Sequence, residues 1–299
     1  MIWKKQNNCI FTVENEGKDM KCCVCEDVEM QPYFKKAYDS KKTFEFYRCP
    51  ECGLVINKTV YDMDSLKWAE INDENMEFQG EIDQNNSLWN RRLGRIKPQA
   101  KFLAELFYNN LFEVGIKSVD YGCGDGLLSD MAGEIYVELA KCDEKVELIG
   151  KYERFLDTKD ERYYSDFDMR DGTFDLAVSA AVLEHMIGMD DVDRFFRLVS
   201  PTGTAIIHTL ICEEVPCDPE WFYIWKPFHC TIWTNKAMAM IYRKYGFLGC
   251  AYHVQSKMWI FFKDFEKYKK AKSIAGKIDG EWVFSENFVD YWKQKPYKK

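Results

Sequence analysis

Four cysteines form two Cys-x-x-Cys pairs near the N-terminus, Cys22 with Cys25 and Cys49 with Cys52, and 23 residues separate the pairs. Each pair can present two thiolates from one tight turn, and two such turns can close a tetrahedron around zinc. A shell of four cysteines leaves no position for a substrate or an activated water. The spacing therefore predicts a structural zinc ribbon, with iron in the same cage as the lesser alternative. Cys23 breaks the spacing and is predicted to be a non-ligand.

A second pattern with chemical meaning is the stretch Lys-Ser-Val-Asp-Tyr-Gly-Cys-Gly-Asp-Gly at residues 117–126. Glycine at every second position lets backbone approach a ligand, and the helix predicted to begin at Leu127 would turn its N-terminus toward that ligand. A dinucleotide fingerprint needs glycine at position 127, and a P-loop needs a lysine after the last glycine. The stretch therefore indicates a nucleotide-binding turn of another kind, between a strand and a helix of an α/β sheet.

The spacing of Asp120, Gly122, Gly124 and Gly126 resembles motif I of the class I S-adenosylmethionine (SAM) dependent methyltransferases. Further along, residues 174–186 carry a Phe-Asp strand start and a Glu-His pair that resemble a segment of the small-molecule members of that family. The resemblance covers residues 118–262. It implies an α/β fold with a Rossmann-like sheet and helices on both faces, and SAM as the cofactor.

The resemblance also implies which residues contact the cofactor. It puts Asp120 near the methionine end of SAM and the glycine turn beneath the cofactor. The predicted cofactor-binding residues are Asp120, Gly122, Cys123, Gly124, Gly126, Glu153 and Asp166.

Two of these assignments rest on strand ends. Glu153 would accept hydrogen bonds from the ribose hydroxyls, although it lies 27 positions after the last glycine of the turn, where about 20 is usual in the comparable dinucleotide unit. Asp166 follows a short predicted strand at 162–165 and would reach the adenine amino group. Asp168 and Asp171 are alternatives to Asp166.

The candidate catalytic residues are Glu184, His185 and His229. Methyl transfer from a sulfonium is a direct displacement, so the protein mainly aligns the acceptor, and a hydroxyl or carbon acid also needs a base. His185 follows the strand that borders the methyl donor and is the candidate base, with Glu184 organising the site. His229 lies in an aromatic stretch, residues 221–233, that resembles the acceptor-covering insert of sugar-modifying members. A packing role for the Glu-His pair, and a lid with a merely satisfied His229, are the alternatives.

The surrounding chain alternates between strand-like apolar runs and stretches of helical spacing. The expected helices span 99–108, 127–140, 194–199 and 235–245. The expected strands span 43–48, 145–153, 162–165, 173–179 and 204–210, with a turn at 200–203 and a closing hairpin of 248–254 and 257–262.

A basic stretch, residues 89–97, precedes the first of the expected helices. Its arginines can meet a carboxylate or phosphate, for example that of the cofactor or of a nucleotide-linked acceptor. The simpler interpretation is a solvated face paired with the acidic stretch at 61–84. Beyond the hairpin, a lysine-rich tail is expected to pack through its aromatic residues, Trp282, Phe284, Phe288 and Trp292.

Composition limits the class of protein. The chain has 299 residues with 46% apolar and 16% aromatic content, enough for a large packed core. Its net charge of −8 and pI near 5.3 disfavour a general nucleic-acid binder. The start of the sequence lacks the apolar core of a signal peptide, and no run is long enough to span a bilayer, so a cytoplasmic location is expected.

The predicted organisation is a zinc ribbon at 1–62, a helical linker and lead-in helix at 63–112, a SAM-binding methyltransferase domain at 113–265 with a lid insert at 213–234, and a C-terminal extension at 266–299. The predicted function is SAM-dependent methyl transfer to a small-molecule acceptor, namely a sugar or nucleotide sugar of polysaccharide or natural-product biosynthesis. The alternatives are an RNA methyltransferase that grips its substrate with the ribbon, and a non-catalytic SAM-fold scaffold. The oligomeric state is left open.

Overall fold

A computed structural model of the protein describes residues 20–38, 43–61, 87–154, 160–186, 188–224 and 229–291. Several parts of the predictions lie outside these residues: 1–19 and 39–42 of the ribbon, the acidic stretch at 62–84, the middle of the expected lid at 225–228, and the end of the extension from Trp292. Within the described residues, no helix combines the length and apolar character needed to cross a bilayer.

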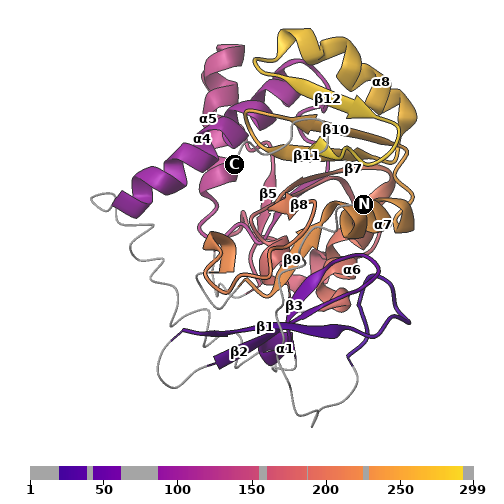
Figure 1. The fold of residues 1–299 in the computed structure, drawn as a ribbon. Coiled ribbons are helices and arrows are strands. Elements are labelled where there is room, and N and C mark those ends of the chain that lie inside the picture. The colour runs from indigo at the N-terminus through magenta and orange to yellow at the C-terminus, as the bar shows by residue number, and fades with distance from the viewer. Residues whose placement is uncertain are drawn as a thin grey trace.

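The larger of the two sheets in the described residues has seven strands, several of which are labelled in Figure 1. Their spatial order is β12 (Trp282–Ser285), β10 (Gly249–His253), β11 (Met258–Phe262), β7 (Val199–His208), β6 (Phe174–Ala180), β4 (Ser118–Tyr121) and β5 (Gly150–Tyr152). The four strands from β7 to β5 are parallel, and the other three pairings are antiparallel. The glycine turn therefore lies in the parallel part, where the carboxyl ends of neighbouring strands share one edge.

Helices cover both faces of this sheet, as the resemblance implies. One face packs against α4 (Ser87–Tyr108), α5 (Leu127–Ala140) and α8 (Phe265–Ile274), and the other against α6 (Met189–Leu198) and α7 (Asn235–Lys244). Figure 1 shows α4 and α5 side by side. Within β6, Leu176 and Val178 belong to one core and Ala177 to the other, because successive side chains of a strand point to opposite faces.

The smaller sheet combines two distant parts of the chain. Its spatial order is β1 (Gln31–Ala37), β2 (Thr43–Arg48), β3 (Val55–Asn57), β9 (Thr231–Thr234) and β8 (Ile211–Cys212). Val55 of β3 pairs with Ile232 of β9 in antiparallel register. The first three strands come from the predicted ribbon and the last two from around the predicted lid, so these segments share one sheet and one apolar core.

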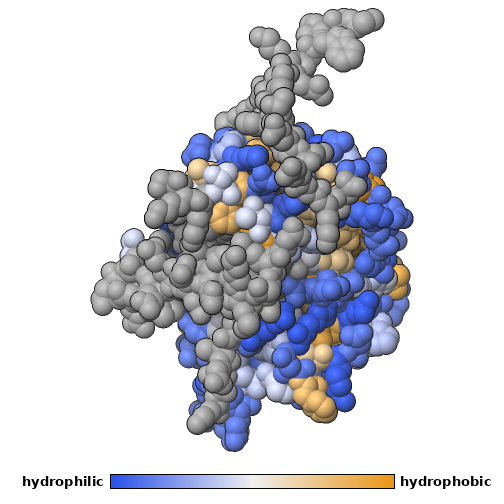
Figure 2. All heavy atoms as spheres, turned by 90° about the horizontal axis from the view of Figure 1, so that it is seen from below, coloured by the Kyte–Doolittle hydropathy of each residue, from blue (hydrophilic) through white to orange (hydrophobic). Residues whose placement is uncertain are grey.

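Short helical turns complete the described fold. They are α1 (Lys58–Tyr61), η1 (Asp166–Asp168), η2 (Leu183–His185), η3 (Phe222–Ile224) and η4 (Ala275–Lys277). Figure 2 views the molecule from the side of β1 and β2, and most of the described surface visible there is hydrophilic, with separate hydrophobic patches.

Several predicted elements are confirmed. The helix predicted over 127–140 coincides with α5, and the strand predicted over 43–48 with β2. The strand at 173–179 and the closing hairpin agree with β6, β10 and β11 to within one or two residues. The tail also packs as expected, with Trp282 and Phe284 against one core and Phe288 against the other, but it additionally forms β12, an edge strand that the sequence analysis missed.

Two strand predictions are wrong. The strand expected over 145–153 is limited to β5, because the Leu148 carbonyl accepts a hydrogen bond from the Ser118 hydroxyl at 2.9 Å instead of entering a ladder. The strand expected over 162–165 is a single bridge between Lys151 and Tyr163. Local side-chain hydrogen bonds compete with strand pairing there: Ser165 N donates to the Asp168 carboxylate at 2.9 Å and begins η1.

The remaining corrections concern where elements begin. α4 begins at Ser87 and includes the whole basic stretch and Pro98, because its packing against α5 outweighs the cost of a proline inside a helix. α6 begins at Met189 and not at residue 194. The turn predicted at 200–203 lies within β7, where the pairing with β6 shifts between Phe174–Val199 and Leu176–Thr204.

Candidate functional site

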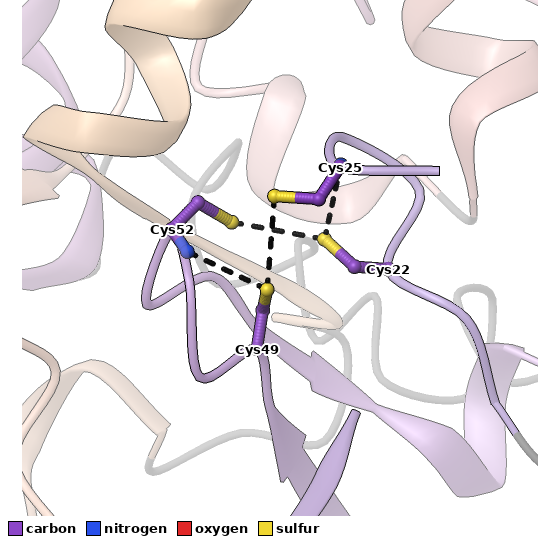
Figure 3. A group of neighbouring side chains, drawn as sticks. All are labelled: Cys22, Cys25, Cys49 and Cys52. Atoms are coloured by element: carbon purple, nitrogen blue, oxygen red, sulfur yellow. Dashed lines mark hydrogen bonds between the residues drawn. The ribbon is translucent and has the colours of Figure 1, made fainter. Parts of the chain in front are cut away.

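The four predicted zinc ligands come together in one cluster, with their sulfur atoms turned toward one another (Figure 3). Cys22 Sγ lies 3.7 Å from Cys52 Sγ, and Cys25 Sγ lies 3.8 Å from Cys49 Sγ. At the usual Zn–S bond of about 2.3 Å, the edges of a tetrahedron of sulfurs are about 3.8 Å long. The donor set and its spacing therefore fit a tetrahedral metal ion, and the cluster leaves Cys23 outside it.

Backbone contacts tie this cysteine cluster to β9. The Thr234 hydroxyl donates to the Cys52 carbonyl at 2.5 Å and accepts from Ala237 N at 3.2 Å, at the start of α7. Asn57 N, at the end of β3, donates to the Cys230 carbonyl at 2.8 Å. Because Cys230 follows His229 directly, the cysteine cluster and the segment that carries this histidine are held by the same strand pair.

The glycine turn joins β4 to α5. Gly122 and Gly126 have φ angles of +72° and +76°, which L-residues with a side chain rarely adopt. A Cβ on Gly122 would lie 2.7 Å from Val182 Cγ1, and one on Gly126 would lie 2.6 Å from Lys151 Cε. A Cβ on Gly124 would meet no atom of the described residues within 4 Å. The two outer glycines are thus packed against the protein, and the middle one faces open space.

Hydrogen bonds hold the turn against the end of β5. Gly122 N and Cys123 N donate to the Tyr152 carbonyl at 2.8 and 3.1 Å. Gly124 N donates to the Glu153 carboxylate at 3.0 Å. The carboxylate predicted to bind the ribose therefore lies within hydrogen-bonding distance of the turn, despite its unusual spacing in the sequence.

Asp120 takes a different position from the rest of the turn. It is buried at the end of β4, and its carboxylate accepts a hydrogen bond from the Ser129 hydroxyl of α5 at 2.9 Å. Burial raises the pKa of Asp120 to about 7, although the bond to Ser129 acts in the opposite direction. The Asp120 carboxylate thus connects the strand to the helix beneath the turn.

The basic stretch reaches the same turn. Arg92 of α4 donates two hydrogen bonds to the Asp125 carboxylate, at 2.9 and 2.5 Å, and only 9% of the Arg92 side chain is exposed. Paired, two-point contacts of this kind are stronger and more directional than single ones. The arginine predicted to meet a ligand or an upstream acid therefore meets a carboxylate of the glycine turn.

Asp166 lies at the start of η1. Its carboxylate accepts hydrogen bonds from the Tyr152 hydroxyl at 2.5 Å and from the Arg194 guanidinium at 2.6 Å, and both bonds lower the pKa of Asp166. Next to it, Phe167 is 80% exposed. Asp168, an alternative to Asp166 in the sequence, instead accepts from the Ser165 hydroxyl at 2.6 Å within the local turn.

The three predicted catalytic side chains converge. Glu184, His185 and His229 each offer a ligand atom, and these atoms lie within 4.8 Å of one another. The rings of the two histidines are 5.0 Å apart between centroids. Glu184 and His185 belong to η2, which follows β6 at the carboxyl edge of the sheet, and the preceding Val182 packs against Gly122 of the turn. We call these three residues the Glu-His-His cluster.

Neighbouring groups orient Glu184 and His229. The Thr209 hydroxyl donates to the buried Glu184 carboxylate at 2.8 Å. His229 Nδ1 lies 2.5 Å from the Tyr223 carbonyl, which can only accept, so Nδ1 carries a proton and the neutral ring has its lone pair on Nε2.

The charge state of Glu184 follows from its surroundings. Burial alone would raise the pKa of Glu184, but the opposite charges of His185 and His229 and the Thr209 hydrogen bond outweigh it, and the pKa lies below its usual value. Glu184 is therefore an anion at neutral pH, held between two imidazoles.

Backbone bonds also join the two segments that carry the cluster. Cys230 N donates to the Glu184 carbonyl at 2.8 Å, and the Thr231 hydroxyl donates to the Met186 carbonyl at 2.8 Å. The position of His229 relative to Glu184 thus depends on β9, the strand that also pairs with the cysteine-bearing module.

The other two histidines are structural. His208 Nδ1 bonds to the Lys257 carbonyl at 2.8 Å. His253 bonds through both ring nitrogens, to the Ser256 hydroxyl at 2.9 Å and the Asp279 carbonyl at 3.0 Å, and stacks on Phe102 at 4.2 Å between ring centroids. Burial lowers the pKa of His253 to about 4.

Sequence reasoning missed three of the groups that shape this site. They are Thr209, which bonds Glu184; Tyr223, whose hydroxyl accepts from Leu210 N at 3.2 Å; and Arg194, which bonds Asp166. Tyr223 fell within the predicted aromatic insert. Thr209 had a weaker signal, since it is a polar residue at the end of an apolar strand.

Comparison with known proteins identifies one matching family. A methyltransferase domain family matches residues 89–248, which is more than half of the chain. A search of curated proteins found no match.

Solved structures with a similar arrangement include several methyltransferases. An O-methyltransferase family protein from Burkholderia thailandensis is 12% identical, with a TM-score of 0.43, and the match covers 63% of this chain and 63% of that one, less than two thirds of its length. Magnesium protoporphyrin IX methyltransferase from Synechocystis, solved with bound SAH, is 14% identical over 64% of this chain and 92% of that one, with a TM-score of 0.43. A SAM-dependent methyltransferase from Aquifex aeolicus is 15% identical over 57% and 94%, with a TM-score of 0.33.

The domain match covers the glycine turn, β5, η1 and the Glu-His-His cluster together. The chain therefore belongs to the methyltransferase domain family.

Proposed function

We propose that this protein is a SAM-dependent methyltransferase that transfers the methyl group of SAM to a small-molecule acceptor, a sugar or nucleotide sugar of polysaccharide or natural-product biosynthesis. The observation that carries the proposal is the contact between the glycine turn and the Glu-His-His cluster through Gly122 and Val182. This contact supports the proposal because it brings the candidate catalytic side chains close to the turn that is proposed to hold the cofactor.

The described residues fit SAM. Gly124 leaves open space for a ligand above the turn, and α5 points its N-terminus there. Glu153 would hold the ribose hydroxyls, and Asp166 the adenine amino group. The exposed ring of Phe167 offers an apolar face to the base. When bound, SAM supplies a sulfonium methyl group for direct displacement.

His185 is proposed to accept the proton of an acceptor hydroxyl, whose electron pair stays on the oxygen. Glu184 is proposed to stabilise the imidazolium that forms, because an adjacent carboxylate favours the charged ring. His229, fixed by the Tyr223 carbonyl, orients the acceptor or serves as the base in place of His185. General base catalysis of this kind is worth about 10²–10⁴ in rate.

The aromatic residues around His229 support a sugar acceptor. Trp221 lies in ring contact with Phe222 and Tyr223, at 5.5 and 5.6 Å between centroids, and Phe222 is 60% exposed. Exposed aromatic faces are suited to the apolar faces of sugar rings, with hydrogen-bonding groups at the edge.

The cysteine cluster is proposed to hold a structural zinc ion, because its sulfur spacing fits and its shell is closed. Thiolates that persist as metal ligands are typical of reducing compartments, which supports the proposal of a cytoplasmic protein. The division into a ribbon at 1–62, a linker at 63–112, a methyltransferase domain at 113–265 with its lid at 213–234, and an extension at 266–299 remains a prediction.

A methyl-transfer screen tests the proposed function. Purified protein is incubated with SAM and with nucleotide sugars, small phenols or RNA, and products are read by mass. The proposal expects a methyl gain in a nucleotide sugar. Methylation of RNA alone would support the alternative acceptor, and absence of SAM binding in calorimetry at millimolar cofactor would exclude both.

A further inference from the structure

We propose that the Glu-His-His cluster binds a divalent metal ion, separate from the ion of the cysteine cluster. The inference rests on the proposed function, because it concerns the same site. It changes one step of that function: His185 becomes a metal ligand, and solvent water takes the acceptor proton.

The donor set is the first argument. One carboxylate and two imidazoles present ligand atoms within 4.8 Å of one another. Such atoms can close on a first-row divalent ion with small side-chain adjustments, since ligand distances in such sites are about 2.0–2.2 Å. Imidazole and carboxylate together suit ions such as Zn²⁺, Fe²⁺ and Mn²⁺. Three protein ligands leave coordination positions for a substrate oxygen, unlike a shell of four cysteines.

Hydrogen-bonding groups next to the proposed ligands also support a metal site. In metal sites, a ligating histidine usually donates its other ring N–H to a carbonyl or carboxylate, and ligating carboxylates are themselves hydrogen-bonded. His229 Nδ1 donates to the Tyr223 carbonyl, which directs the lone pair to Nε2. Thr209 donates to Oε2 of Glu184. Both orienting contacts are in place.

The third argument is rigidity. Glu184 is only 4% exposed, and the bonds from Cys230 and Thr231 to the η2 segment fix the two halves of the cluster relative to each other. Rigid ligands lower the cost of assembling a metal site.

An ion at this position would act on the acceptor. A hydroxyl bound to a divalent cation has a lowered pKa, so its O–H bond breaks with the electron pair staying on oxygen and the proton passing to a water molecule. Glu184 and His185 follow Val182, which contacts the glycine turn, so the oxygen anion would form in the part of the site next to that turn. This chemistry selects acceptors that offer an oxygen to the metal, such as hydroxyls of a sugar.

Manganese is the probe for this site. Mn²⁺ prefers oxygen and nitrogen donors, so it should leave zinc in the thiolate cluster. Mn²⁺ is titrated into the zinc-containing full chain while the electron paramagnetic resonance signal of unbound Mn²⁺ is recorded. We expect one bound Mn²⁺ per chain, with nitrogen couplings from imidazole in its pulsed spectrum.

Variants localise the ion. Glu184→Gln and His229→Gln should weaken Mn²⁺ binding at least about tenfold, because even groups behind a ligand are worth about 10–100-fold. His208→Asn is the matched control, since His208 lies outside the cluster and bonds to Lys257. Zinc content, measured in every variant, reports whether the cysteine cluster and its sheet are intact.

The binding experiment would overturn the inference in two ways: no Mn²⁺ bound by the wild-type chain, or bound Mn²⁺ without nitrogen couplings. The couplings test the wild type itself, so the result does not depend on whether a variant folds. Methyl transfer without bound Mn²⁺ or a second metal would reject the metal site and leave the proposed function standing. Bound Mn²⁺ with imidazole couplings but no methylated acceptor would support the metal site and contradict the proposed function.

Discussion

The cysteine cluster and the Glu-His-His cluster are two metal-competent groups of opposite character, joined by one strand. The cysteine cluster is assembled from two tight turns, each visible in the sequence, and its four thiolates would surround an ion completely. The Glu-His-His cluster combines a short helix with a distant loop, and its three ligands would leave an ion open to an acceptor. We propose that the first stabilises the fold and that the second takes part in the reaction.

The shared strand gives the closed cluster a functional consequence. β9 pairs with β3, and its Thr234 bonds the Cys52 carbonyl. Cys230, directly before β9, bonds the Glu184 carbonyl, and Thr231 of β9 bonds the Met186 carbonyl. Loss of order at the cysteines should therefore displace His229 from Glu184, even though no cysteine of the cluster belongs to the predicted catalytic set.

The largest expected effect on stability and activity comes from removing a ligand of the cysteine cluster. Cys49→Ser removes one of four ligands, and structural zinc is worth on the order of 10 kcal/mol in small zinc peptides. The variant should lose zinc, unfold at a much lower temperature and lose methyl transfer. Metal analysis and thermal unfolding measure this. Cys23→Ser is the matched control and should keep its zinc; a stable, zinc-loaded Cys49→Ser protein would contradict the assignment.

Substitutions in the Glu-His-His cluster should leave the fold intact and remove activity. His185→Gln and His229→Gln should each lower the rate of methyl transfer by about 10²–10⁴-fold, while SAM affinity and zinc content stay close to wild type. Rates are followed with the acceptor found in the screen, and His208→Asn serves as the control. Full turnover in either variant would exclude that histidine from the reaction.

Substitutions in the glycine turn should have a smaller effect, and two of them distinguish a packing role from contact with the ligand. Gly122→Ala puts a Cβ 2.7 Å from Val182 at a φ of +72°, so stability should fall by about 1–3 kcal/mol. Gly124→Ala shares the positive φ, at +58°, but meets no atom of the described residues within 4 Å, so it should lose less stability and mainly weaken SAM binding. Denaturant unfolding and calorimetry measure the two quantities. Equal stability losses would remove the packing argument.

His253 lies outside the Glu-His-His cluster and serves as a reference histidine. Its substitution should have the smallest effect, a change in how stability depends on pH. Its folded pKa is about 4, below the ordinary value of 6.5, so between these values the unfolded chain binds the proton that the folded chain does not. Stability should therefore fall as the pH falls, by about 2 kcal/mol from about pH 7 to about pH 5. His253→Asn should flatten this dependence in unfolding experiments across that range, with methyl transfer retained. An unchanged pH profile would contradict the buried, neutral ring.

Local patterns predicted much of the fold. The run from Leu127 to Ala140 has a glycine before it and regular apolar spacing, and α5 has those bounds. The four cysteines were identifiable because their spacing is a local property of two turns. The glycine turn was likewise readable from ten consecutive residues.

What the sequence could not show is which distant segments meet. Nothing in residues 55–57 identifies 231–232 as their strand partner, because backbone pairing between strands carries little side-chain information. Arg92 meets Asp125 across 33 positions, a contact set by how α4 packs on the sheet. The Glu184–His185 pair and His229 were proposed separately, and only the fold brings them within one cluster.

The most direct test of the account is methyl transfer itself, measured as the mass of nucleotide sugars incubated with the protein and SAM. The account predicts that a nucleotide sugar exchanges a hydrogen for a methyl group with wild-type protein and not with His229→Gln. Methylation at the wild-type rate by His229→Gln, or SAM binding without methylation of any nucleotide sugar, would contradict it.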